Sequence, residues 1–178
     1  MNMQRRRFFG VLAVGGAAAL GAGYWRLPAG PAPAALSIDA ALVLLQRLAT
    51  EPLVSRQGWS PTEVFNHCAQ SIDFSIDGYP ELKPAWFRQT VGPLAFSVFA
   101  ARGAMRHPLD QPIPGAPAID SPVAVSDALA RLQQAFARFA AHQGALQPHF
   151  AYGELSHAEY AEAHVLHLYN HLSLIQRG

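Results

Sequence analysis

The chain has 178 residues, which is enough for one compact domain with a short additional segment. Its composition is 51% hydrophobic and 14% charged with a formal net charge of +1, and no basic stripe is interleaved with aromatic residues, so nucleic acid is excluded as an expected partner. Cys68 is the sole cysteine, which excludes an internal disulfide and a Cys-x-x-Cys metal or haem motif.

The N-terminal segment has the pattern of an export signal. Three arginines at 5–7 are followed by Phe8 and Phe9, and then by an uncharged run from 10 to 23 that is rich in Gly, Ala, Val and Leu. A basic stretch before an apolar run is typical of a signal sequence, and the order Arg-Arg-x-Phe-Phe resembles the twin-arginine type. A retained membrane anchor is the alternative, because about 17 apolar residues are near the lower limit for crossing a bilayer.

These features divide the chain into three parts. Residues 1–27 are predicted to be the twin-arginine signal or N-terminal anchor, residues 28–36 a Pro- and Ala-rich linker, and residues 37–178 the folded domain. We therefore expect the protein to use the twin-arginine export machinery and to work in the periplasm or another extracytoplasmic compartment. An uncleaved leader would hold it at the membrane.

Apolar residues at three- and four-residue steps predict the first helices of this domain. The first helix is capped by Ser37 and runs to about Ala49. The second begins at a capping box in residues 60–63, where a serine caps the helix, proline takes the first helical position and a glutamate returns to the cap. This helix is expected to reach about Ser75.

The helical pattern continues through the second half of the chain. A helical stretch follows Lys83-Pro84, with a kink or break expected at Gly92-Pro93. Residues 107–122 contain five prolines and no periodicity, which predicts an irregular crossover. An amphipathic helix is expected from Ala128 to near Gly144, and a last helix from the capping box at 156–159 to the chain end. With no strand-like alternation of useful length, we expect an all-α fold, a four-helix up-and-down bundle with a long Pro-rich crossover.

Histidines are concentrated on the last predicted helix. His164, His167 and His171 follow one another at steps of three and four, which places them on one face. The other side of this helix is apolar, so we expect the histidines to face the interior, and His67 is predicted to point inward from the second helix. One histidine and a pair spaced by four can converge on one cation, and three nitrogen ligands leave a position open for water or substrate.

A purely structural role is the alternative for these histidines. A buried histidine often hydrogen-bonds a carbonyl or a side chain, and the three on the last helix could form a polar contact between helices. Other histidines lie in loops or at helix ends and are expected to be exposed and without a role: His107, His142, His149 and His157. Cys68 is expected to be a small buried residue rather than a nucleophile, and Asp73 and Glu154 to be solvated carboxylates.

Three stretches of the domain resemble an uncharacterised family, the domain of unknown function numbered 1569. They are WSPTEVFNHCAQSI (59–72), HFAYGELS (149–156) and HVLHLYNHL (164–172). The resemblance extends over residues 37 to 175, and the family is similar to the DinB/YfiT-like superfamily of metalloenzymes. It implies a four-helix bundle that binds a divalent metal through one histidine of an early helix and a His-x-x-x-His pair of the last. By matching position, the implied ligands are His67, His167 and His171.

The resemblance also has one departure. The family tends to show a histidine doublet where this chain has Asn170-His171, and the additional His164 is a candidate substitute for His167 as a ligand. The implied metal is a divalent transition metal: zinc, nickel, iron or manganese. The superfamily implies thiol transfer, hydrolase or isomerase chemistry. Cytoplasmic thiols are scarce outside the cell, so metal-dependent hydrolysis of a small molecule is the better expectation. The alternative is a non-catalytic metal- or ligand-binding domain, or a structural helical domain, of the cell envelope.

Overall fold

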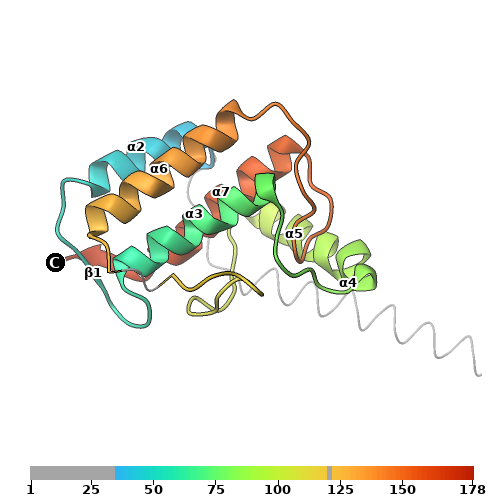
Figure 1. The fold of residues 1–178 in the computed structure, drawn as a ribbon, viewed down its shortest axis with the longest axis horizontal. Helices are drawn as coiled ribbons and strands as arrows, with labels where there is room; N and C mark the ends of the chain where they lie inside the picture. Colours follow the sequence, from blue (N-terminus) through green and yellow to red (C-terminus); the bar gives the residue numbers. More distant parts are fainter. Residues whose placement is uncertain (1–34, 120–121) are drawn as a thin grey trace, which may run out of the picture.

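The structure, a computed structural model, describes residues 35–119 and 122–178, so the predicted signal or anchor and most of the linker lie outside the described residues. Within these ranges the chain is largely helical and carries one small two-stranded sheet (Figure 1). The helices are α2 (Ile38–Leu48), α3 (Pro61–Asp77), α4 (Ala85–Gln89), α5 (Val91–Arg102), α6 (Val125–Ala141) and α7 (His157–Leu172). The strands are β1 (Leu53–Ser55) and β2 (Ile175–Arg177).

Four long helices share one hydrophobic core. α3 contacts both α6 and α7, and α2 lies along α6 (Figure 1). Large side chains without solvent exposure fill the space between them, among them Phe65, Phe136, Phe139 and Tyr160. Burial of each such side chain contributes about 2–3 kcal/mol. Packing therefore fixes how α3 and α7, the two helices that carry the interior histidines, lie relative to each other.

Both predicted capping boxes are confirmed. At the start of α3, the Glu63 carboxylate accepts a hydrogen bond from the backbone N–H of Ser60 at 2.7 Å, and the Ser60 hydroxyl accepts from the Glu63 N–H at 3.3 Å. Ser156 and Glu159 repeat the arrangement at the start of α7. Each box satisfies two N–H groups that have no partner within the helix, which sets where the helix begins.

Replacing Ser156 with alanine is expected to lower the free energy of unfolding by about 1 kcal/mol, because the Glu159 N–H loses its acceptor. Urea unfolding followed by circular dichroism measures the change. Ser97→Ala serves as the control, because the Ser97 hydroxyl only donates to the Pro93 carbonyl on an exposed face of α5. A loss no larger than that of the control would show that the box does not stabilise α7.

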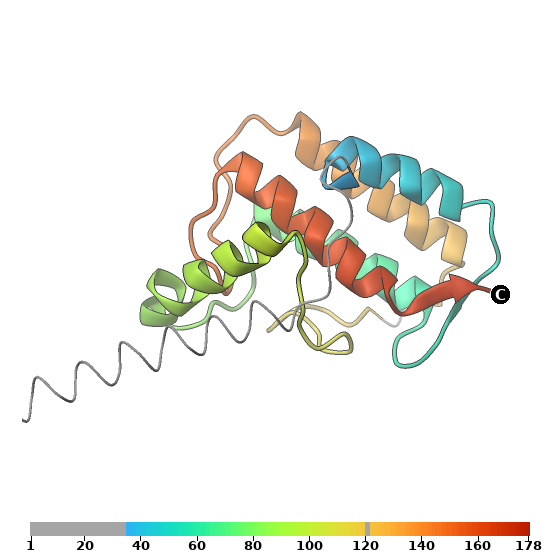
Figure 2. The same ribbon diagram turned by 180° about the vertical axis from the view of Figure 1, so that it is seen from behind.

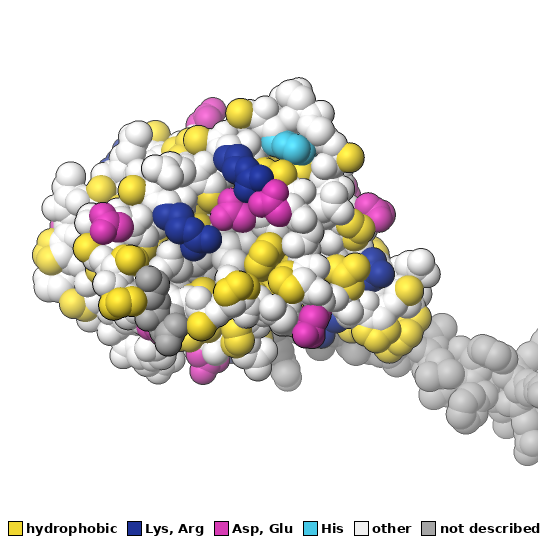
Figure 3. Space-filling view, in the orientation of Figure 1, with side chains coloured by type: hydrophobic (Ala, Val, Ile, Leu, Met, Phe, Trp, Pro, Cys, Tyr) yellow, Lys and Arg dark blue, Asp and Glu magenta, His cyan; other side chains and the backbone are white. Residues whose placement is uncertain are grey.

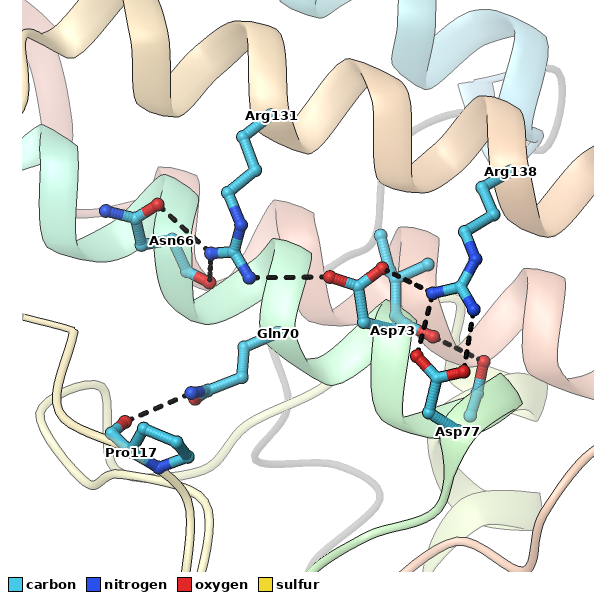
Figure 4. A network of polar contacts seen from close by, with 9 residues as sticks. Asn66, Gln70, Asp73, Asp77, Pro117, Arg131 and Arg138 are labelled. Carbon is cyan, nitrogen blue, oxygen red and sulfur yellow. Dashed lines mark hydrogen bonds and ion pairs between the residues drawn. The ribbon is translucent and has the colours of Figure 1, made fainter.

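A polar network joins the exposed sides of α3 and α6 (Figure 4). Arg131 donates to the Asn66 carbonyl at 3.0 Å and to the Asp73 carboxylate at 3.4 Å, and Arg138 bridges Asp73 and Asp77. Asp73 is thus an ion-pair partner rather than a merely solvated carboxylate. In the space-filling view, basic and acidic side chains adjoin over these helices (Figure 3). The pairs are partly exposed, so each contributes modestly to stability.

The irregular connection between α5 and α6 agrees with the predicted crossover over its described residues. Its start is buried at Ala104 and Met105, and Ile113 is buried further along. The Gln70 side chain on α3 donates to the Pro117 carbonyl at 3.0 Å, which holds the crossover against the domain (Figure 4). α5 itself packs on α7 (Figure 2). None of the helices in the described ranges is long and apolar enough to cross a membrane.

Three boundaries differ from the sequence-based expectation. The break before α5 falls at Thr90, and Gly92-Pro93 lies inside the first turn of α5, where a missing N–H costs nothing. α7 ends at Leu172 instead of reaching the chain end. The last residues form β2, which pairs antiparallel with β1, so the expectation of no strands was wrong. Strands of three residues are too short to show a recognisable alternation.

Candidate metal centre

Imidazoles from two helices meet inside the protein. α3 supplies His67, and α7 supplies His167 and His171 one turn apart; one ring nitrogen from each lies within 4.8 Å of the others. The Nε2 atoms of His67 and His167 are 3.2 Å apart. In a tetrahedral site with metal–nitrogen bonds of about 2.0–2.1 Å, two ligand nitrogens are separated by roughly 3.3 Å. The His67–His167 pair therefore has the spacing of two ligands on one ion, and the three histidines are close enough together that they could hold a metal.

Several nitrogen atoms of this group lack hydrogen-bond partners among the described residues. His171 is fully buried, yet neither of its ring nitrogens has a partner, and His67 Nδ1 has none. Leaving a buried polar atom unpaired costs about 1–3 kcal/mol, so such atoms are rare without a role. A hydrogen-bonded polar contact between helices would not leave both His171 nitrogens unpaired, whereas coordination of a cation would give one of them a partner.

The electrostatic surroundings keep all three imidazoles neutral at pH 7. Burial, with a smaller contribution from nearby His107, lowers the pKa of His67 to about 4. Burial and the neighbouring histidines lower the pKa of His171 to about 2 and hold that of His167 well below its ordinary value. A neutral imidazole keeps the nitrogen lone pair that a metal needs.

A fourth histidine comes from the crossover. The His107 ring lies 5.0 Å from the rings of both His167 and His171, measured between centroids. Its Nδ1 donates to the Pro108 carbonyl at 2.7 Å, so its Nε2 carries the lone pair, and this buried atom has no partner among the described residues. The expectation that His107 is exposed and without a role was therefore wrong in its burial, because a loop position does not reveal tertiary contacts.

A cavity of about 280 Å³ adjoins the histidine group. His67, His167 and His107 form part of its wall, while His171 lies behind them against the indole of Trp59, with the two rings nearly parallel. Among the described residues, no carboxylate lines the cavity, and Lys83 is its one fully charged side chain. Much of the remaining wall is apolar: Met105, Ile113, Phe150, Ala151 and Tyr152. The cavity thus gives a small molecule access to His67 and His167.

Two further histidines lie beside this cavity in structural roles. His149 is buried, which corrects the expectation of an exposed residue; its Nδ1 accepts from the backbone N–H groups of Ala151 and Tyr152, both at 3.1 Å. His164 Nε2 donates to Ser75 Oγ at 3.2 Å, because the Ser75 proton is used on the Ile72 carbonyl. His164 therefore joins α7 to α3 and is not part of the three-histidine group.

The remaining titratable candidates are placed as follows. His157 is exposed, as expected, whereas His142 is half-buried. Cys68 is buried in the core, and burial raises the pKa of its thiol, so it is the small buried residue that the sequence predicted. Glu154 is exposed at the surface. None of these residues lies in the three-histidine group.

The turn at residues 149–153 forms one wall of the cavity because two glycines let it approach α4 and α5. A Cβ at Gly92 would collide with the Ala151 carbonyl oxygen. Gly153 has φ +80, and a Cβ there would press on the Arg88 carbonyl. Both contacts are with backbone atoms, which cannot move aside as the end of a side chain can.

Gly92→Ala is expected to lower the free energy of unfolding by about 2–3 kcal/mol through this overpacking. Thermal and urea unfolding measure the loss. Leu94→Ala is the matched control on the same helix, where a half-exposed side chain should change stability by about 0.5 kcal/mol or less. Equal stability of the two variants would show that the turn does not pack against α5 as described.

Fold and site together define a class: a largely helical protein with a three-histidine group that could hold a metal ion. A sequence model of the family described as "Protein of unknown function (DUF1569)" matches residues 35–177. The chain therefore belongs to the DUF1569 family. No curated protein and no solved structure matches it.

Proposed function

We propose that His67, His167 and His171 bind one divalent transition metal ion, and that the protein is a metal-dependent hydrolase of a small molecule. The observation that carries the proposal is the convergence of three neutral imidazole nitrogens within 4.8 Å, beside a cavity. Zinc, nickel, iron and manganese all accept imidazole ligands, so the donor set leaves the choice among them open. A divalent metal with three imidazole ligands supplies an open coordination position and lowers the pKa of bound water toward 7.

The residues around this site have different roles in the proposed function. His67 and His167 present the site to the cavity, and Trp59 covers His171 on the other side and excludes water there. The apolar part of the cavity wall would take the body of a small substrate.

His107 is the candidate general base, a group that sequence reasoning did not identify. Its Nδ1 proton is held by the Pro108 carbonyl, so Nε2 is free to accept a proton. It lines the cavity together with His67 and His167. A base in this position typically contributes about 10²–10⁴-fold to a hydrolytic rate.

We also propose a specific fold type and a cellular location for the protein. The shared core of α2, α3, α6 and α7 and the His-x-x-x-His pair on α7 support a DinB-like four-helix up-and-down bundle. The twin-arginine pattern at residues 5–9 supports export through the twin-arginine machinery to the periplasm or another extracytoplasmic compartment. These residues lie outside the described ranges, so their sequence alone supports this part.

The test is a screen of the metal-loaded full chain against small esters, lactones, amides and phosphoesters. We expect hydrolysis that requires metal and disappears in His171→Ala. His107→Gln should keep the metal content but lower kcat by about 10²-fold, and His142→Gln, altered in a loop away from the site, should match the wild type. Full metal loading without hydrolysis of any compound would contradict the hydrolase assignment and favour a non-catalytic metal-binding domain.

A further inference from the structure

An exposed apolar patch covers α4 and the start of α5. It consists of Leu82, Trp86, Val91 and Leu94, which are 44%, 63%, 45% and 52% exposed. α4 has no buried residue, and α5 carries no charged residue before Arg102, although one side of it faces solvent. A helix that is apolar on all sides is normally buried on all sides by other parts of a protein or by lipid. Large exposed apolar patches of this kind mark interaction surfaces.

Basic side chains lie beside the patch. Lys83 is exposed and Arg88 is half-buried; the Arg88 guanidinium donates to the Lys83 carbonyl at 2.9 Å, and the Lys83 ammonium lies 5.3 Å from the Phe87 ring centroid. The nearby acidic side chain, Glu81, lies against Gly115 in the crossover. In the space-filling view, hydrophobic side chains gather at the end of the molecule where α4 lies, with basic side chains next to them (Figure 3). Tryptophan combined with Lys and Arg is typical of segments at a membrane–water interface.

The first described residues of the chain lie next to the C-terminal end of α5. Leu36 lies against Gly103 at the C-terminal end of α5, and the Ala35 carbonyl accepts a hydrogen bond from Tyr169 at 3.3 Å. The apolar run at 10–23 precedes this point by about ten residues, which span up to roughly 35 Å when extended. α5 is only about 18 Å long. A leader inserted in a bilayer and the patch can therefore meet the same membrane surface.

We propose that the Leu82–Leu94 patch rests on the surface of a lipid bilayer that contains anionic lipid. Trp86 and Leu94 enter the headgroup region, and Lys83 and Arg88 contact anionic headgroups. The contact is interfacial, since α4 and α5 are too short to span a bilayer. A symmetric dimer through the same patch would instead bring the cations of the two copies together, which disfavours a second copy as the occupant.

An environment-sensitive NBD fluorophore on the full chain tests the contact. It is attached to Leu94→Cys or, as a matched control, to Val43→Cys on α2, where the native side chain is 46% exposed. Cys68 needs no replacement, because its thiol is buried and should not be labelled. Vesicles of phosphatidylcholine are added with and without phosphatidylglycerol. The control reports tethering through the leader alone, which would leave its label in water.

We expect the label at position 94 to gain several-fold in intensity and to shift to shorter wavelength with phosphatidylglycerol vesicles, while the label at 43 stays unchanged. Lys83→Gln combined with Arg88→Gln, or high salt, should weaken the response. Identical emission from the two labelled positions would overturn the proposal. So would a shift at position 94 that appears without vesicles, which would show that the leader or a second copy covers the patch.

Discussion

Lowering the pH from 7 to about 4.5 is expected to unfold the metal-free protein. Burial lowers the pKa of His67 to about 4, of His164 to about 3 and of His171 to about 2, against an ordinary value of 6.5. Below pH 6.5 the unfolded chain therefore binds protons at these histidines, whereas the folded chain does not. The free energy of unfolding is therefore fully retained above pH 6.5, where these histidines are neutral in both states. It falls as the pH is lowered toward 4.

The expected size of this loss is large. Each such histidine costs about 1.4 kcal/mol of stability per pH unit below 6.5, so three of them cost about 8 kcal/mol at pH 4.5. Small domains are stable by about 5–15 kcal/mol in total. Buried His149 and His167, whose pKa values are also lowered, steepen the loss further.

Urea unfolding in EDTA at a series of pH values between 8 and 4 measures this dependence. His164→Asn is the informative variant, because asparagine can still donate to Ser75 but does not titrate. Between pH 6 and 5, the free energy of unfolding of this variant should fall less steeply than that of the wild type, by about 1.4 kcal/mol per pH unit. A free energy of unfolding that stays constant from pH 8 to 5 would contradict the neutral, buried state of the histidines.

Metal binding is expected to raise the thermal stability of the protein strongly at pH 7. A ligand at a free concentration 1,000-fold above its Kd stabilises the folded state by about 4 kcal/mol, provided that it does not bind the unfolded chain. For a domain of this size that corresponds to a rise in Tm of about 10 °C. One of the two ring nitrogens of His171, neither of which has a partner among the described residues, would gain one in the process.

Thermal unfolding with zinc, nickel, iron or manganese salts, each compared with EDTA, measures the shift. His67→Ala and His171→Ala should abolish the shift at the same metal concentration. His142→Ala should retain it, since that ring lies outside the three-histidine group and hydrogen-bonds the Ala145 carbonyl in its own loop. A shift that persists in His171→Ala would place the metal elsewhere on the chain.

The long helices were predictable because their signals are local. Both capping boxes involve residues three apart, and the apolar stripe of α6 is visible in its sequence. The inward direction of His67 and of the histidines on α7 follows from the same helical periodicity. What periodicity does not supply is the distance between two helices, so the 3.2 Å separation of His67 and His167 required the structure.

The loop histidines were not predictable in the same way. His107 and His149 lie in segments without periodicity, and their positions depend on long-range contacts such as the hydrogen bond from Gln70 to Pro117 and the approach of residue 151 to Gly92. One signal was available for His107: it opens the predicted Pro-rich crossover, which is irregular in sequence but packs against the domain. β2 was also missed, since its partner β1 lies far away in the sequence.

The central claim is that His67, His167 and His171 bind a metal ion, and elemental analysis of the full chain tests it most directly. The protein is purified from its native compartment without a histidine tag or chelator, alongside His67→Ala and His171→Ala, with circular dichroism to confirm that all three are folded. We predict about one equivalent of a transition metal in the wild type and none in either variant. A folded wild type that contains no metal, and takes up none when zinc, nickel, iron or manganese is added, would contradict the claim.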